Sequence, residues 1–169
     1  MRTSSSAAAE SVSPLGVERL FRFGVWCTIA VGVSHLIVTA LTALGSPDPG
    51  TERALDAMRG VSTTLPGIRS DMAQLYYGFG VTMALLAIGF GLLDLVVLRL
   101  APGILGRSTA LLWVNIAVSA PLLVVAVLAF PLPPILATAG SLAAYVWALA
   151  MTRRRLARSP SAGFEGRST

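Results

Sequence analysis

Charge is scarce in this 169-residue chain, and lysine is absent. Asp, Glu, Lys and Arg make up 12% of the residues and apolar residues 54%, and all 13 basic residues are arginine. Charged residues make up about 25% of an ordinary soluble domain, so this composition excludes that class. Arginine without lysine, together with abundant alanine, glycine, leucine and valine, indicates a GC-rich bacterial genome.

The residues that most often build reactive centres are also few. Cys27 is the only cysteine, which excludes an intramolecular disulfide, and His35 is the only histidine. Because no second histidine, cysteine or glutamate stands at ligand spacing from His35, we predict no metal site and no cofactor. The chain also lacks the Walker, Rossmann, Ser-His-Asp, CxxC and HExxH patterns, so no common catalytic motif assigns a reaction.

Long apolar runs are what the chain has instead. A helix needs about 20 apolar residues to cross the bilayer core, and four runs reach or approach this length. We predict an all-α, polytopic membrane protein: a four-transmembrane-helix up-down bundle over residues 21–152 between a disordered tail, 1–20, and a basic tail, 153–169. The expected helices are about 22–44, 74–99, 108–130 and 134–153.

The arginines indicate the orientation of this bundle. They concentrate before the first helix, between the second and third, and after the fourth, whereas the connection 45–74 mixes arginine with acidic residues. By the positive-inside rule, both termini are cytoplasmic in a bacterial inner membrane. Orientation also explains the net charge of +5, so we predict membrane lipids as partners and no nucleic acid.

The long outer connection contains a predicted amphipathic helix between Thr51 and Gly60. Thr51 is a suitable N-cap, and Gly60 can adopt the left-handed conformation after the last turn. Leu55 and Met58 would form the apolar face of this helix. At the entry to the second long helix, we expect Ser70 or Asp71 as the N-cap.

Small and polar residues at helical spacing predict which helix faces meet, because these residues mark helix contacts in lipid. The first helix carries such a stripe at Thr28, Gly32, His35, Thr39 and Thr42. The stripes expected to converge with it are Gln74, Gly78, Thr82 and Gly89; Ser108, Asn115 and Ser119; and Thr138, Ser141, Tyr145 and Thr152.

His35 is the first candidate for function, because an ionisable residue inside a membrane is by default a functional hypothesis. We predict His35 as a catalytic acid or base, with Asp71 or Tyr77 orienting a substrate. The alternative is that neutral His35 only hydrogen-bonds a neighbouring helix. The predicted ligand-binding residues are Thr39, Arg69, Gln74, Thr82, Asn115, Ser119, Ser141 and Tyr145.

Asp94 is the second candidate, in a polar layer nearer the cytoplasm. An alternative without function is that its carboxylate pairs with Arg99 or Arg107 at the membrane surface.

The segment RSDMAQLYYGFG, residues 69–80, follows a helix with a central histidine and a long outer loop. It resembles a group of small four-helix bacterial membrane proteins of unknown function, in which the second helix opens with a polar residue, an aromatic pair and a Gly-aromatic-Gly step. Gln74 replaces the acidic residue expected there, and the resemblance implies no activity. In size and helix number the chain is also similar to sterol-isomerase and sigma-2-receptor-like four-helix proteins.

Three functions follow from these features. The first is binding of a hydrophobic small molecule or lipid within the bundle, with isomerase- or cyclase-like acid–base chemistry at His35. The second is an oligomeric transporter or channel subunit that uses His35 and Asp94 on a proton path, which requires a homo-oligomer. The third is an accessory or assembly protein without catalysis. The gathering of polar residues at two depths favours the first.

Overall fold

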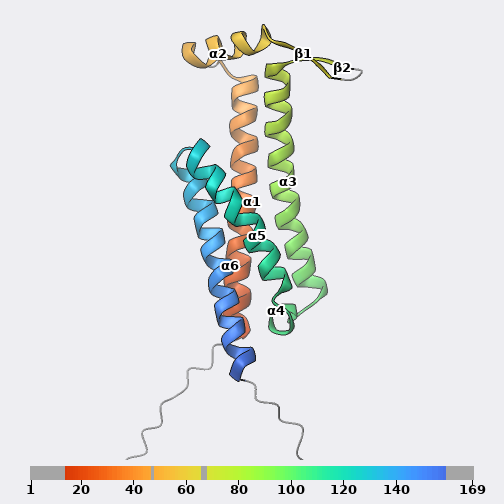
Figure 1. Ribbon diagram of the computed structural model, residues 1–169, viewed down its shortest axis with the longest axis vertical. Helices are drawn as coiled ribbons and strands as arrows, with labels where there is room; N and C mark the ends of the chain where they lie inside the picture. The colour runs from red at the N-terminus through yellow and green to blue at the C-terminus, as the bar shows by residue number, and fades with distance from the viewer. Residues whose placement is uncertain (1–13, 47, 66–67, 159–169) are drawn as a thin grey trace, which may run out of the picture.

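Helices dominate the computed structural model, which describes residues 14–46, 48–65 and 68–158 (Figure 1). This confirms the all-α prediction, with one short hairpin added. The helices are α1 Pro14–Leu44, α2 Pro49–Arg59, α3 Met72–Leu100, α4 Ile104–Arg107, α5 Ala110–Ala129 and α6 Leu132–Arg158, and the strands are β1 Ser62–Leu65 and β2 Ile68–Asp71. Within the described residues, α1, α3, α5 and α6 are long and apolar enough to cross a membrane.

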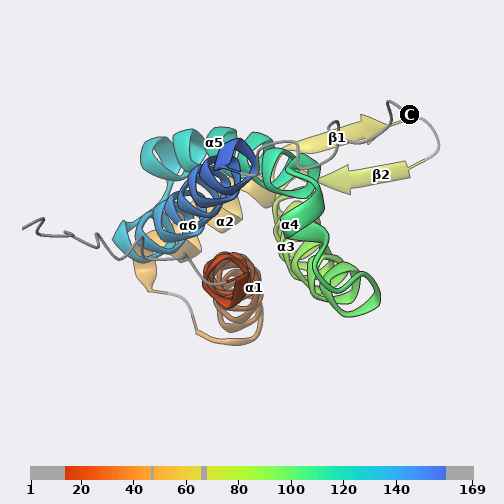
Figure 2. The same ribbon diagram turned by 90° about the horizontal axis from the view of Figure 1, so that it is seen from below.

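The long helices run alternately up and down, and α1 is central among them. Helix α1 packs against α3 on one side and α6 on another, while α5 lies on the far side of α6 (Figure 2). One end of the molecule holds the first turns of α1, helix α4 and the last turns of α6, and we call it the terminal end. The opposite end, with α2 and the β1–β2 hairpin, is the loop end. There α1 and α3 extend well beyond the α5–α6 turn (Figure 1).

The helices extend further into the predicted tails than expected. Helix α1 begins at Pro14, so residues 14–20 are helical, and α6 continues to Arg158. The remaining tail residues, 1–13 and 159–169, lie outside the described residues.

Helix α2 forms as expected but starts earlier and ends differently. Asp48, not Thr51, is its N-cap, because Pro49 provides a favourable first helical residue and the Asp48 carboxylate accepts hydrogen bonds from the N–H groups of Gly50 and Thr51 at 2.9 and 3.2 Å. Gly60 does not adopt the left-handed conformation, since its φ is −68°. Leu55 is buried as predicted.

The β1–β2 hairpin leads directly into α3. Ser62 pairs with Asp71 in the antiparallel register, and Asp71 then caps α3 by accepting a hydrogen bond from the N–H of Gln74 at 2.7 Å. The predicted cap at Asp71 is confirmed.

The face of α3 that meets α1 differs from the predicted stripe. Gln74, Gly78, Thr82 and Gly89 are all exposed. The packed face instead carries small residues at alternating steps of four and three, the spacing of helices that cross at about 20°. Its members are Ala73, Tyr77, Gly80, Ala84, Ala87, Gly91, Asp94 and Leu98. The predicted stripe was wrong because glycines occur on both faces of α3, Gly78 and Gly89 on the exposed one and Gly80 and Gly91 on the packed one, so small size alone does not identify the contact face.

Glycines bring α1 into close contact with both neighbours. A Cβ atom on Gly32 would lie 2.8 Å from the backbone oxygen of Ala84 in α3. A Cβ on Gly24 would lie 2.7 Å from Cε1 of Tyr145 in α6, whose ring is fully buried. Neither contact leaves room for a side chain, so both glycines are needed for the packing of α1.

We therefore expect Gly32→Ala to lower the free energy of unfolding by about 1–3 kcal/mol, the usual cost of overpacking. The matched control is Gly89→Ala, since no atom lies within 4 Å of a Cβ at Gly89. That variant should be as stable as the parent or slightly more stable. Unfolding in mixed detergent micelles measures both, and equal stability of the two variants would contradict the packing.

The Asp48 cap predicts that the stability of helix α2 depends on pH. Hydrogen bonds from the Thr51 hydroxyl, the Thr51 N–H and the Gly50 N–H hold the pKa of Asp48 below its usual value of 3.8. Because the folded pKa is lowered, this stabilisation is complete above the unfolded pKa and is lost as the pH falls through the folded pKa, beginning below about pH 5. NMR chemical shifts of α2 should report this fraying. Asp48→Asn keeps a capping oxygen but cannot titrate, so persistence of the same transition in that variant would show that it does not come from Asp48.

Candidate functional site

His35 lies on α1 where α3 and the α5–α6 turn meet it. Its ring is half-buried and contacts Phe130 edge-on, with ring centroids 6.0 Å apart and planes at 83°. On the α3 side stands Gly80, where a Cβ atom would lie 3.2 Å from Oγ1 of Thr39 and 3.6 Å from Nε2 of His35. Gly80 therefore lets α3 pass close to both polar side chains.

The imidazole nitrogens of His35 are the most informative feature of this region. Among the described residues, none forms a hydrogen bond with either nitrogen, although the ring is positioned by Phe130 and Gly80. His35 lies about 14 Å along α1 from Leu44, at about 1.5 Å per residue. A polar group that lacks a hydrogen-bond partner is costly wherever water cannot reach it.

The other two predicted catalytic residues do not lie beside His35. The Tyr77 hydroxyl donates a 3.4 Å hydrogen bond to the carbonyl of Thr42, which is about 10 Å along α1 from His35. Asp71 caps α3, about 14 Å along that helix from Gly80. The structure therefore does not assemble the predicted acid–base set.

The predicted ligand-binding residues near the loop end are spread out as well. Arg69 is exposed on β2, and Gln74 accepts a 2.9 Å hydrogen bond from the Ser70 hydroxyl. Thr82 is exposed on α3. Of these predicted residues, Thr39 is the one that the structure places next to His35.

The remaining predicted residues are buried in a separate polar cluster, nearer the terminal end. Asn115 donates its amide to Oδ1 of Asp94 at 3.2 Å and to the carbonyl of Leu111 at 3.0 Å, which links α5 to α3. Ser141 lies 3.0 Å from the Thr28 hydroxyl and donates to the carbonyl of Gly24 at 2.9 Å, which links α6 to α1.

Tyr145 and Ser119 are buried on the same two helices as Ser141 and Asn115. The Tyr145 hydroxyl is fully buried near Ser141 and Thr28, without a hydrogen bond of acceptable geometry to either. Ser119 is 5% exposed and Asp94 3%. This burial confirms the inward faces predicted for the third and fourth helices. Asp94 pairs with Asn115 and not, as the alternative had it, with Arg99 or Arg107.

The two polar regions therefore differ in access. The cluster of buried polar residues lies among all four long helices. Its members are Asp94, Asn115, Ser119, Ser141 and Tyr145, and this arrangement holds the helices together. His35 and Thr39 are half-buried at the edge of the α1–α3 pair. Of these two regions, only the one at His35 and Thr39 is open to a molecule that approaches from outside the bundle.

Sequence reasoning missed Gly80 and Phe130 as the neighbours of His35. The signal for Gly80 was its place in the four-and-three spacing of small residues on α3. Phe130 had no such signal, because its position depends on how far the α5–α6 hairpin reaches along α1.

Two hollows lie elsewhere, both at the terminal end. One, of about 240 Å³, lies between α1, α4 and α6, and the other lies along the first turns of α1. Within the described part of the chain, no group of three His, Cys, Asp or Glu side chains could hold a metal ion. No protein-family model, curated protein or solved structure matches the chain.

A structural role of the enclosed cluster gives a prediction. Asn115→Ala removes the hydrogen bond to buried Asp94, and we expect it to lower the free energy of unfolding by about 1–3 kcal/mol. Asp94→Asn keeps an oxygen for the Asn115 amide and should change stability little. Thermal unfolding in detergent distinguishes the two, and a fully stable Asn115→Ala variant is the result that contradicts a structural role.

Proposed function

We propose that this protein binds a membrane-soluble amphipathic molecule beside His35, on the part of α1 and α3 that extends past the α5–α6 turn. The observation that carries the proposal is the half-buried imidazole, which has no hydrogen-bond partner among the described residues. A ligand hydroxyl or carbonyl could supply that partner, and Thr39 would offer a second polar contact.

The depth of His35 narrows the class of ligand. Phospholipid head groups stay at the membrane surface, whereas we place His35 inside the hydrocarbon layer, because it lies within the apolar candidate span Leu15–Leu44. The ligand is therefore a molecule whose polar group can lie inside the hydrocarbon layer, such as one with an isolated hydroxyl, ketone or quinone oxygen. The exposed apolar side chains of Val38, Phe79 and Met83 would contact its hydrophobic part.

Binding is favoured over catalysis and over transport. Asp71 caps α3 at its start and the Tyr77 hydroxyl donates to the Thr42 carbonyl, so neither side chain is paired with His35. A proton path would have to join His35 to Asp94, which lies about 21 Å farther along α3 than Gly80. The described residues between them on the packed face of α3 are glycine and alanine, so this arrangement gives no support to a proton path within one chain.

We propose the inner membrane of a bacterium as the location, with both termini in the cytoplasm. Arg19, Arg22, Arg99 and Arg107 lie at the terminal end, and so does Arg153, whose guanidinium carbon lies 5.2 Å from the ring centre of Trp113. This concentration of arginine and an interfacial tryptophan supports a cytoplasmic terminal end.

Because His35 is the only histidine, selective isotope labelling reports on it alone. We expect the imidazole NMR signals of the protein in lipid nanodiscs to shift on addition of a long-chain alcohol or ketone. An alkane of the same length, which has no polar group, should leave them unchanged. Equal responses to the ketone and the alkane, or no response to either, would falsify a polar ligand site.

A variant pair tests the same proposal by retention of ligand. His35→Leu should lose the non-phospholipid amphipath that copurifies with the parent protein, as measured by mass spectrometry of lipid extracts. Ser34→Ala is the matched control, since Ser34 is exposed beside His35 and its hydroxyl bonds to its own helix at the Val31 carbonyl. Parent-like helical circular dichroism in both variants shows that the loss does not come from unfolding.

A further inference from the structure

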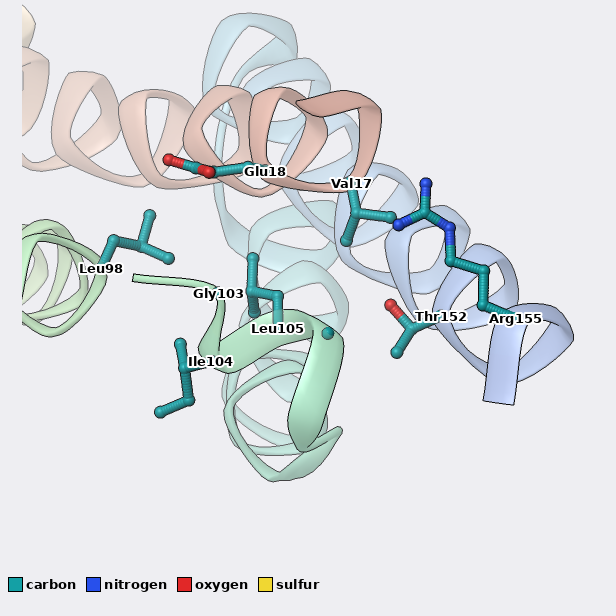
Figure 3. A pocket seen from close by; sticks show the side chains of 9 residues that line it. Val17, Glu18, Leu98, Gly103, Ile104, Leu105, Thr152 and Arg155 are labelled. Atoms are coloured by element: carbon teal, nitrogen blue, oxygen red, sulfur yellow. The ribbon is translucent and has the colours of Figure 1, made fainter. Parts of the chain in front are cut away.

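Two groups of polar side chains lie toward the terminal end, and they differ in whether their members converge. In the larger hollow, the Glu18 carboxylate points away from Thr152 and Arg155 (Figure 3). Asp94 and Asn115 are instead in direct contact, because the Asn115 amide donates a 3.2 Å hydrogen bond to Oδ1 of Asp94. Asp94 is 3% exposed and Asn115 0%, so the protein encloses this pair.

One oxygen on each side chain of the pair is left without a donor. Among the described residues, neither Oδ2 of Asp94 nor Oδ1 of Asn115 has a hydrogen-bond partner, and both atoms are buried. An amide has two N–H donors. Asn115 uses one of them on Asp94 and the other on the Leu111 carbonyl, at 3.0 Å. The pair itself therefore has no donor left for its two remaining oxygens.

An ionised Asp94 would also carry an uncompensated charge. Asp94 takes part in no ion pair with another described residue. Helix α5 has no titratable side chain. From α6 and α1, the titratable groups on this side are Tyr145, which interacts electrostatically with Asp94, and Cys27, which interacts with Tyr145. A phenol and a thiol carry no positive charge in either protonation state, and an unpaired buried charge is costly.

We propose that Asp94 and Asn115 form a proton-binding site, in which Oδ2 of Asp94 carries the proton and donates it to Oδ1 of Asn115. The carboxylic acid and the amide would then share two hydrogen bonds in one ring, N–H to O and O–H to O. One proton thus removes the buried charge and satisfies both remaining oxygens. A water molecule in its place would leave the carboxylate charged. This site is separate from the one at His35 and does not depend on it.

The bound proton makes the contact between α3 and α5 depend on pH. Helix α3 packs mainly against α1, and α5 mainly against α6. The Asp94–Asn115 pair joins α3 directly to α5. Release of the proton would place a charge between these two helices and remove one of the two hydrogen bonds of the ring. Proton release therefore weakens the contact and favours the entry of water between α3 and α5.

Infrared spectroscopy of the full chain in lipid nanodiscs, with the aspartate carboxyls labelled with carbon-13, tests this proposal. The other aspartates are Asp48, Asp56 and Asp71, and none of them is buried. At about pH 6, roughly two units above the ordinary aspartate pKa, such carboxyls are ionised. We expect the parent protein to show the C=O stretch of a labelled carboxylic acid, which lies at higher frequency than the carboxylate bands, and Asp94→Asn to lack it.

Asp56→Asn is the matched control, since Asp56 is exposed and pairs with Arg59 at 2.7 Å. This variant should keep the acid band at full intensity. A parent protein without the band would show that Asp94 is ionised and overturn the proposal, and this measurement needs no variant. An acid band that persists in Asp94→Asn would overturn it as well.

Asn115→Ala tests which atom receives the proton. Loss of the amide should shift the acid band of Asp94 to higher frequency, because the carboxylic acid loses both hydrogen bonds to Asn115. Ser119→Ala is the matched control, since Ser119 is also buried on α5, and it should leave the frequency unchanged. A parent-like frequency in Asn115→Ala, with helical circular dichroism retained, would overturn the shared proton.

Discussion

Close backbone contact of α1 with two neighbours is the constraint on which the rest of the structure depends. In lipid there is little hydrophobic drive to bring helices together, so contact area between them has to come from shape. Gly32 allows α1 to approach the backbone of α3, and Gly24 receives the buried ring of Tyr145 from α6. These two contacts set the distance of both neighbours from α1. The half-buried environment of His35 and the enclosure of the polar cluster both follow from that distance.

The enclosed cluster adds specificity to this packing. Each of its two hydrogen-bonded links joins a different pair of helices, α3 to α5 through Asp94 and Asn115, and α1 to α6 through Thr28 and Ser141. Small residues alone would allow neighbouring helices to slide along one another. A polar pair that must be satisfied away from water fixes the register, because a shift of one turn would leave each group without its partner.

Apolar run length was enough to predict the four long helices, since the thickness of a bilayer sets that length directly. Burial of Asn115, Ser119, Ser141 and Tyr145 was predictable too, because a polar side chain in an apolar helix turns away from lipid. The face of α3 was not predicted, because small residues occur on both its exposed and its packed face, so no local pattern distinguishes the two. The neighbours of His35 could not be predicted from the sequence for another reason. They depend on the point along α1 at which the α5–α6 hairpin ends, which no local pattern encodes.

The unequal lengths of the two helical hairpins explain why the molecule has two different regions for polar contacts. If α5 and α6 reached as far as α1 and α3, the His35 ring would be enclosed and could be satisfied by a helix, as Asp94 is by Asn115. Because the shorter hairpin ends at Phe130, which lies against the edge of the imidazole, the ring is held in place but not covered. The polar ring that a symmetric four-helix bundle would enclose is thus left half-buried at the edge of the α1–α3 pair.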